Sequence, residues 1–279
     1  MVPGGRGSSE IKEVIKLDRL FDTVLVRPPS KTYWKCVSTN PEHKNIDVNL
    51  AIHQHREYVK ILKENDIKVI ELPPLEEHPD SVFVQDTSII GATSQKALIC
   101  RFGEPTRRGE EISVSETLKN MGFETIKVQS PGTIEGGDVL VTDQNIVFIG
   151  ISPRTNEEGI SQFRNVFPQV SVREVKLTKV FHLLSAANYL GNKRMAISPQ
   201  VIDISPFQDF KLITIPEDEL YANNMLYLGE NRVLMPAGYP ETMEKLKKEG
   251  FKPIEVDVSE FWKGDGGVTC LNSPFYKPL

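Results

Sequence analysis

The sequence Gly264-Asp265-Gly266-Gly267-Val268-Thr269-Cys270 presents a single cysteine directly after a glycine-rich turn, nine residues before the C-terminus. Glycines permit positive φ angles and allow a ligand to approach the main chain closely. Asp265 adds a negative charge within reach of such a ligand. A cysteine on such a turn is a candidate nucleophile, provided that a base, a cation or hydrogen bonds help it to form a thiolate. Because free cysteine is also among the most buried residue types, a packing role for Cys270 is an equally good interpretation of this segment alone.

Polar residues recur along the chain at a nearly constant interval that leads to this cysteine. Asp86, Glu135, His182 and Cys270 occupy corresponding positions early in successive β-rich segments, at separations of 49, 47 and 88 residues. The last separation is twice 44, and the skipped position falls near Asn223-Asn224. Units of similar length that each contribute a polar residue from the same place imply a closed ring with a central site.

The apolar pattern between these residues indicates a unit of two strands, a helix and a further strand, repeated about five times. No Gly/Ser-rich linker separates the units, so a single ring is favoured over two domains. The sequence therefore predicts an α/β fold of ββαβ-type repeats, with residues 11–279 in one domain and residues 1–10 as a flexible N-terminus. Strands are expected at 81–90 and 180–184, among others, and helices at 45–65, 107–120, 156–166 and 240–248.

The composition is that of a soluble globular protein and argues against several classes of function. Of the 279 residues, 39% are hydrophobic, and the net charge of −5 creates no general attraction to nucleic acid or to anionic membranes. No apolar run approaches the roughly 20 residues of a membrane span, and the N-terminus has no apolar signal core. The three widely spaced cysteines, Cys36, Cys100 and Cys270, fit free thiols in a reducing compartment. We therefore expect a cytoplasmic protein that binds a small molecule. The sequence does not determine the oligomeric state, and a homo-oligomer is one of the possibilities.

Two acidic segments are candidates for binding a cation. Asp80 precedes an expected strand and Asp86 lies within it, where an unpaired acid is unfavourable. Glu135 and Asp138 flank Gly136-Gly137, a turn that lets a ligand lie near the backbone while carboxylates hold it. In both segments the alternative is a turn with solvated acids.

His182 is the candidate acid or base. It lies between Phe181 and Leu183, and a histidine among apolar residues is more often a core residue than a catalyst. Its place in the periodic series favours catalysis. His53 and His55 resemble a metal pair, but two-residue spacing on a helix directs them to different faces, so we expect a structural role and no metal site.

Arg101 and Arg154 are candidate anchors for the acidic end of a substrate, because the planar guanidinium matches a carboxylate. Surface ion pairs are the alternative for both. Arg107 and Arg108 are expected to begin a solvent-exposed helix.

In the order and spacing of these segments, the chain resembles the dimethylarginine dimethylaminohydrolases of the guanidine-modifying superfamily, which also includes arginine deiminases and amidinotransferases. The likeness spans nearly the whole chain and includes Asp80-Ser-Val-Phe-Val-Gln-Asp86, Arg101-Phe-Gly-Glu-Pro-Thr-Arg-Arg108, Glu135-Gly-Gly-Asp138, Arg154-Thr-Asn156 and Asp265 to Cys270. The resemblance implies a five-bladed α/β propeller with pseudo-fivefold symmetry, the pentein fold, which agrees with the predicted repeat. It also implies hydrolysis of dimethylarginine or monomethylarginine to citrulline and an amine, through a covalent S-alkylthiouronium intermediate and without metal, nucleotide or other cofactor.

The resemblance further implies roles for the reacting residues. Cys270 would attack the guanidinium carbon, and His182 would act as general acid and then as general base. Glu135 would grip the guanidinium and orient this chemistry, and Asp86 would be a second guanidinium-binding carboxylate.

For the amino-acid end of the substrate, the resemblance implies that Asp80 lies near the α-amino group and that Arg101 and Arg154 bind the α-carboxylate. The resemblance also makes Gln85 a candidate substrate-binding residue, although it is a departure, because the dimethylaminohydrolases usually carry a Glu there that contacts the guanidine side. Residues 28–44, a candidate lid, match no family segment.

Four functions follow from these residues. Hydrolysis of methylated arginine is favoured over deimination of free arginine, because of the overall resemblance. An amidinotransferase would use the same intermediate and pass it to an amine. A non-catalytic binding protein that retains the fold is the least favoured.

Overall fold

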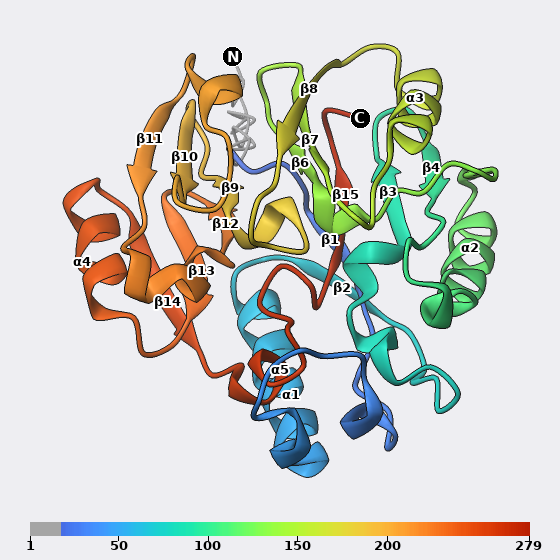
Figure 1. The fold of residues 1–279 in the computed structure, drawn as a ribbon, viewed down its shortest axis with the longest axis horizontal. Coiled ribbons are helices and arrows are strands. Elements are labelled where there is room, and N and C mark those ends of the chain that lie inside the picture. Colours follow the sequence, from blue (N-terminus) through green and yellow to red (C-terminus); the bar gives the residue numbers. More distant parts are fainter. Residues whose placement is uncertain (1–17) are drawn as a thin grey trace, which may run out of the picture.

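The structure is a computed structural model that describes residues 18–279. The expected flexible segment 1–10 lies outside the described residues, so the single domain over residues 11–279 stays a prediction. Figure 1 shows the sheets arranged around a common centre, with the longer helices on the outside. In the described residues 18–279, no helix combines the length and the apolar character that a membrane crossing requires.

Within residues 18–279, five three-stranded units make up the ring, and all follow one plan. In each unit the first two strands are antiparallel, and the third strand runs parallel to the second. The repeat predicted from the spacing of polar residues is therefore confirmed. In ring order the units are β15 (Ser273–Tyr276), β1 (Thr23–Val26), β2 (Lys68–Glu71); β3 (Ser88–Gly91), β4 (Lys96–Ile99), β5 (Glu124–Lys127); β6 (Val139–Val141), β7 (Ile146–Ile151), β8 (Ser171–Lys176); β9 (Ala187–Tyr189), β10 (Arg194–Ile197), β11 (Lys211–Thr214); and β12 (Leu226–Gly229), β13 (Arg232–Pro236), β14 (Lys252–Val256).

The C-terminal strand completes the first unit. Strand β15 pairs antiparallel with β1, where Val24 lies opposite Pro274, and parallel with β3, where Phe275 lies opposite Ile90. The first and second units thereby form one six-stranded sheet. Because the last described strand pairs with the first, the two ends of the described chain share one unit.

Four α-helices link the second strand of a unit to its third strand: α1 (Val48–Glu64), α2 (Glu110–Asn120), α3 (Glu157–Val166) and α4 (Pro240–Lys248). In the fourth unit the 3-10 helix η8 (Ser205–Phe207) takes this place. Helix α1 begins where the Asp47 side chain accepts from the backbone N–H groups of Asn49 and Leu50, which satisfies two donors that a helix start leaves free. Its apolar face, which includes Tyr58 and Leu62, packs into the core.

The first two strands of each unit are buried on both faces, whereas the third strands are largely exposed or only partly buried. On β1, Val24 and Val26 belong to one apolar cluster and Leu25 to another, because successive side chains of a strand point to opposite faces. Burying each such side chain stabilises the fold by roughly 1.5–3 kcal/mol. Burial on both faces keeps these strands in place. The turns that precede the first strands, near the centre of the ring, are thereby positioned as well.

Two expected strands are wrong. Residues 81–90 form the 3-10 helices η3 (Pro79–Val82) and η4 (Val84–Thr87), and strand β3 begins only at Ser88. Residues 180–184 contain no strand, and the 3-10 helix η7 (Leu183–Ser185) follows them. Residues 81–87 are buried, and so are Leu183 and Leu184 in the second segment. Their apolar residues imitate a strand, because a short apolar run does not distinguish a strand from a short helix.

The helices at 45–65, 156–166 and 240–248 are confirmed to within a few residues as α1, α3 and α4. The helix expected from residue 107 begins at Glu110, because Gly109 has a φ of 117° and interrupts the chain before it. Arg107 instead ends the 3-10 helix η5 (Pro105–Arg107) and is only 4% exposed, so the prediction that it begins a solvent-exposed helix is wrong.

Candidate active site

A pocket of about 340 Å³ lies at the centre of the ring, beside the turns that precede the first strands of the units. These turns are η4 before β3, η6 (Gly136–Asp138) before β6, η7 before β9, η9 (Glu217–Asn223) before β12, and the 264–270 turn before β15. Neighbouring turns contact one another in ring order. The charged or nucleophilic side chains along the pocket wall include Asp80, Asp86, Arg107, Arg154, His182, Asp265 and Cys270.

Cys270 ends the glycine-rich turn, and its N–H donates to the carbonyl of Gly267 at 3.0 Å. The turn requires glycine, because a Cβ on Gly266 would lie 2.1 Å from the ring of Phe83 and one on Gly267 would lie 2.5 Å from Cγ of Asn224. Burial raises the pKa of the Cys270 thiol, and the charge of Asp86 raises it further. In this structure the thiol therefore keeps its proton at neutral pH, and a positive charge beside it would favour the thiolate.

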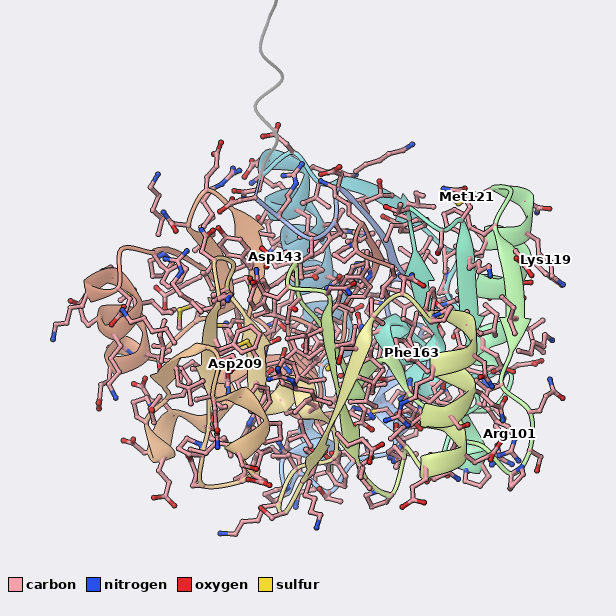
Figure 2. The ribbon with its side chains drawn as sticks, turned by 90° about the horizontal axis from the view of Figure 1, so that it is seen from above. Arg101, Lys119, Met121, Asp143, Phe163 and Asp209 are labelled. Carbon is pink, nitrogen blue, oxygen red and sulfur yellow. The ribbon has the colours of Figure 1, made fainter. Side chains whose placement is uncertain are left out.

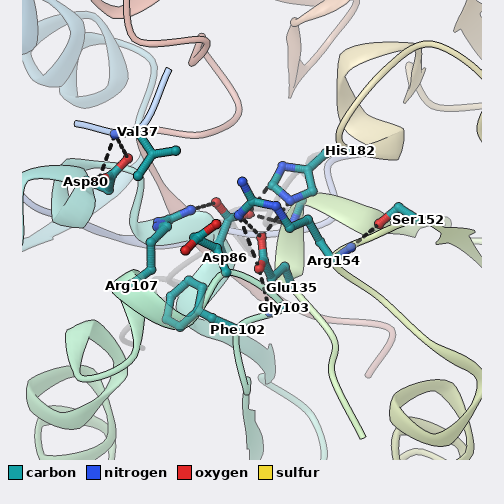
Figure 3. Close-up of polar contacts among 12 residues, drawn as sticks. Val37, Asp80, Asp86, Phe102, Gly103, Arg107, Glu135, Ser152, Arg154 and His182 are labelled. Atoms are coloured by element: carbon teal, nitrogen blue, oxygen red, sulfur yellow. Dashed lines mark hydrogen bonds and ion pairs between the residues drawn. The ribbon is translucent and has the colours of Figure 1, made fainter. Parts of the chain in front are cut away.

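His182 and Glu135 form a directly bonded pair. His182 Nε2 lies 2.8 Å from Oε2 of Glu135, whose side chain is fully buried (Figure 3). The other carboxylate oxygen of Glu135 accepts from the N–H of Gly103 at 2.9 Å. Burial alone would lower the pKa of His182, but the charge of Asp86 and the hydrogen bond to Glu135 outweigh burial and raise it to about 9. His182 is therefore protonated at neutral pH and can deliver a proton.

Asp138 fixes the segment that carries His182. Its fully buried carboxylate accepts from the N–H of Leu183 at 3.0 Å and from the Ser152 hydroxyl at 2.7 Å. The Glu135-Gly-Gly-Asp138 motif thus contacts His182 through its first residue and the neighbouring backbone through its last. This double contact explains the spacing of the two acids.

Asp86 is held between an arginine and the neighbouring turn. One carboxylate oxygen accepts from Arg107 Nη1 at 2.8 Å, and the other accepts from the N–H of Gly137 at 3.0 Å. Burial would raise the pKa of Asp86, but the charges of His182 and Arg107 lower it. Asp86 is therefore ionised and presents a fixed negative charge to the pocket.

Arg107 and Glu104 are charged pocket residues that the sequence did not predict, and Arg107 is the one that contacts the other site residues. Its guanidinium bonds the buried Glu110 through two nitrogens, at 2.8 and 3.2 Å, and lies 4.6 Å from the centre of the Phe102 ring (Figure 3). The only signal in the sequence was its place in the family-like segment 101–108. The repeat pattern assigned it to a surface helix.

The two arginines expected at the substrate carboxylate lie in different places. Arg154 lines the pocket, with Nη1 3.4 Å from Glu135 and its side chain 17% exposed. Arg101 donates to the carbonyl of Gly132 at 3.2 Å and is not among the described residues that line the pocket. In Figure 2, Arg101 lies toward the edge of the molecule, near α3.

Asp80 and Asp265 hold the candidate lid, residues 28–44, over the pocket. Both carboxylate oxygens of Asp80 accept from the N–H of Val37 at 3.1 Å. One oxygen of Asp265 accepts from the N–H of Thr39 at 2.6 Å and from the hydroxyl of Ser38 at 3.0 Å. In this structure both acids therefore anchor the lid while also lining the pocket.

Gln85 is turned away from the pocket. Its side chain is 2% exposed, Nε2 donates to the carbonyl of Gly136 at 3.2 Å, and it is not among the described lining residues. Gln85 thus links turn η4 to turn η6 through this hydrogen bond. The structure thus brings together Asp80, Asp86, Arg154, His182, Asp265 and Cys270 on the pocket wall and Glu135 against His182, and it leaves Gln85 and Arg101 outside.

A geometric alternative for three of these residues is a metal site. One ligand atom each from Asp86, Glu135 and His182 lies within 4.8 Å of the others. Asp86 is paired with Arg107, and Glu135 with Arg154 and His182. These ligand atoms are therefore already used in ion pairs and hydrogen bonds within the protein.

Comparison with known proteins identifies the family. Residues 35–277 match the family model described as N,N dimethylarginine dimethylhydrolase, eukaryotic. An uncharacterized protein of Aeropyrum pernix is 45% identical over 94% of this chain and 98% of its own. The N(G),N(G)-dimethylarginine dimethylaminohydrolase of Pseudomonas aeruginosa is 37% identical over 92% of this chain and 100% of its own.

A solved structure of the Pseudomonas aeruginosa enzyme, a cysteine-to-serine mutant complexed with citrulline, is 36% identical to the chain. It superimposes with a TM-score of 0.85 and covers 92% of this chain and 100% of that chain. This likeness and the five three-stranded units confirm the pentein fold. The chain belongs to the dimethylarginine dimethylaminohydrolase family.

Proposed function

We propose that the protein hydrolyses dimethylarginine or monomethylarginine to citrulline and the corresponding amine. The observation that carries this proposal is the convergence of four groups at one 340 Å³ pocket: the thiol of Cys270, the His182–Glu135 pair and the ionised Asp86. A nucleophile, a proton donor and fixed negative charge are what the displacement of an amine from a guanidinium requires. Family membership supports the same reaction.

Binding of the substrate prepares the nucleophile. The guanidinium cation lies against Asp86 and offsets the negative charge that raises the pKa of the Cys270 thiol. The thiol proton leaves to water, and the thiolate attacks the guanidinium carbon. The substrate thus supplies the positive charge that this pocket lacks beside the sulfur.

The first chemical step forms the carbon–sulfur bond and breaks a carbon–nitrogen bond. His182, protonated at neutral pH because of Asp86 and Glu135, gives its proton to the departing amine. Glu135 keeps the imidazole oriented throughout, because Gly103 and His182 fix its carboxylate. The product of this step is an S-alkylthiouronium on Cys270.

The second step hydrolyses this intermediate. His182, now neutral, takes a proton from water as the oxygen attacks the same carbon. Collapse of the adduct breaks the carbon–sulfur bond, passes the hydroxyl proton of the adduct to water, releases citrulline and returns the thiolate. The two steps use one imidazole in opposite directions: it gives a proton in the first step and takes one in the second.

The amino-acid end of the substrate is bound by Arg154 and the lid. Arg154 is partly exposed to the pocket and has one weak ion pair, so it can bind an α-carboxylate. Asp80 and Asp265 lie beside the lid backbone, within reach of an α-amino group that enters there. Arg101, although implied by the resemblance, has no part in this proposal.

Product analysis tests the reaction. Purified protein is given an equimolar mixture of asymmetric dimethylarginine and arginine, and citrulline, dimethylamine and ammonia are measured. We expect citrulline and dimethylamine in equal amounts, with little ammonia. Ammonia in excess would instead establish an arginine deiminase, and an amidine formed on an added amine would establish an amidinotransferase. If no citrulline forms and Cys270→Ser binds the substrate as the wild type does, the protein is a binding protein without catalytic activity.

We also infer that the protein works in the cytoplasm as a small-molecule enzyme. Cys36, Cys100 and Cys270 are all free thiols, which fits a reducing compartment. Cell fractionation tests this location, and recovery of the protein in the secreted fraction would contradict it.

A further inference from the structure

The fifth position of the ring holds Asn224, which directly follows η9. The spacing of Asp86, Glu135, His182 and Cys270 skips one unit, and Asn224 lies at the skipped place, in the turn before β12. Its Nδ2 points at Cys270 Sγ at 3.8 Å, within hydrogen-bond reach of the larger sulfur atom. The unit without a charged site residue thus contributes an amide to the nucleophile.

The orientation of this amide is fixed by its neighbours. Oδ1 of Asn224 accepts from the N–H of Thr269 at 2.7 Å and from the Thr269 hydroxyl at 3.0 Å. A backbone N–H can only donate, so the atom that faces it must be the amide oxygen. Nδ2, which can only donate, is therefore the atom that faces Cys270.

Asn224 is also held tightly in place. It is 4% exposed, and a Cβ on Gly267 would lie 2.5 Å from its Cγ. The neighbouring Tyr221 hydroxyl donates to the carbonyl of Gly266 at 2.7 Å, which fixes the glycine-rich turn from the same side. An amide held this way keeps its N–H directed at the sulfur without a cost for ordering it at each turnover.

The Nδ2–H group of Asn224 is placed to stabilise a negative charge on the Cys270 sulfur. Burial and Asp86 both oppose a negative charge on Cys270. A thiolate is a stronger hydrogen-bond acceptor than a thiol, so a donor fixed at this distance favours the ionised form. We propose that Asn224 is a further catalytic residue, which stabilises the Cys270 thiolate through its Nδ2–H. This proposal rests on the proposed role of Cys270 as the nucleophile.

Alkylation of Cys270 by iodoacetamide tests the proposal without substrate. The thiol proton leaves to water, the thiolate displaces iodide, and a carbon–sulfur bond forms. The rate therefore follows the thiolate fraction, and mass spectrometry of the Cys270 peptide separates it from the buried Cys36 and Cys100. The rate is measured from pH 6 to 10 in wild type, Asn224→Ala and Asn224→Asp.

The two variants separate the donor from the packing. Asn224→Ala removes the donor, and we expect Cys270 alkylation at pH 8 to fall roughly tenfold, with its pH midpoint shifted upward. Asn224→Asp retains an oxygen for Thr269 but places negative charge beside the sulfur, so a larger fall and shift are expected. Asn223→Ala is the matched control, because the Asn223 side chain bonds Ser198 instead of the sulfur; its profile should match wild type.

An Asn224→Ala profile that coincides with the Asn223→Ala profile would overturn the proposal, as would faster alkylation in Asn224→Asp. Circular dichroism and the urea midpoint of each variant show whether it is folded. Failure of the proposed function would appear separately, as a wild-type protein that forms no citrulline.

Discussion

The imidazole of His182 and the carboxylate of Glu135 lie 2.8 Å apart, with the Glu135 side chain fully buried and the His182 side chain 13% exposed. This pair, together with the charge of Asp86, raises the pKa of His182 to about 9, well above the ordinary value of 6.5. The folded protein thus holds a proton on His182 over a pH range in which the unfolded chain releases it. Stability, proton transfer and catalysis are linked through this one contact.

Unfolding free energy should decrease as the pH rises from about 6.5 to about 9. In this window the folded protein binds one more proton at His182 than the unfolded chain, so the stability that the charged imidazole contributes is present below pH 6.5 and is lost as the pH passes 9. The slope from this group is at most about 1.4 kcal/mol per pH unit. Urea unfolding of wild type and His182→Gln measures it, and the variant should lose this slope.

His55 provides a control with the opposite sign. Burial lowers its pKa to about 4, so its contribution is present above pH 6.5 and is lost as the pH falls toward 4. His55→Gln should therefore keep the wild-type slope between pH 6.5 and 9. Equal slopes for wild type and His182→Gln in that window would contradict the assignment of the raised pKa to His182.

Glu135→Gln should lower the pKa of His182 from about 9 toward 6.5, because it removes the negative partner while it keeps the side-chain shape. Citrulline formation should fall with it, since less of the proton donor remains at neutral pH. NMR titration of the His182 ring protons measures the pKa. Glu104→Gln serves as the comparison, because Glu104 lines the pocket but bonds Thr106 instead of His182. A His182 pKa that stays near 9 in Glu135→Gln would refute this link.

The ring could be predicted from the sequence because each repeat carries the same local patterns at a regular spacing. Strands such as β10 (Arg194–Ile197), helices such as α4 (Pro240–Lys248), and the spacing of one polar residue per unit all follow from local pattern. Asp86 and His182 were found by their positions in that series, although the strands expected around them are 3-10 turns. The position of a residue along the repeat was therefore more informative than its expected local structure.

Contacts between residues far apart in the sequence determine the parts of the site that local sequence patterns do not predict. Arg107 lies in the site because Asp86, 21 residues earlier in the sequence, pairs with it in the interior. Its other partner, Glu110, is only three residues away, but that spacing does not distinguish a buried pair from a surface pair. Asn224 reaches Cys270 across 46 residues of sequence. Gln85 and Arg101 were assigned to the substrate by resemblance, yet their side chains bond backbone carbonyls in neighbouring turns.

Arg154 and Arg101 should respond differently to alanine. Arg154→Ala should raise KM for methylated arginine roughly 10- to 100-fold, the usual loss of a hydrogen-bonded charge pair, and should have little effect on a decarboxylated analogue. Arg101→Ala should leave both substrates nearly unchanged, because Arg101 donates to Gly132 outside the pocket. Steady-state kinetics with the two substrates measures this. An equal loss on both substrates in Arg154→Ala would mean that it does not bind the α-carboxylate.

Asp265→Asn should loosen the lid. Asn keeps the shape and tolerates the φ of 60° at this position, but it weakens the charge-assisted bonds from Ser38 and Thr39. We expect a several-fold higher KM and faster proteolytic cleavage within residues 28–44. Asp66→Asn is the matched control, since Asp66 also has a φ of 60° but lies outside the lid contacts. Cleavage at the wild-type rate in Asp265→Asn would show that Asp265 does not anchor the lid.

Acid-quenched mass spectrometry during turnover of asymmetric dimethylarginine tests directly whether Cys270 is the nucleophile of guanidine hydrolysis. We expect a Cys270 peptide heavier by the mass of the substrate minus dimethylamine, present during turnover and gone after the substrate is exhausted. This adduct should be absent from Cys270→Ser, which should form no citrulline. Continued citrulline formation by Cys270→Ser, or turnover of the wild type without any adduct on Cys270, would contradict this role of Cys270.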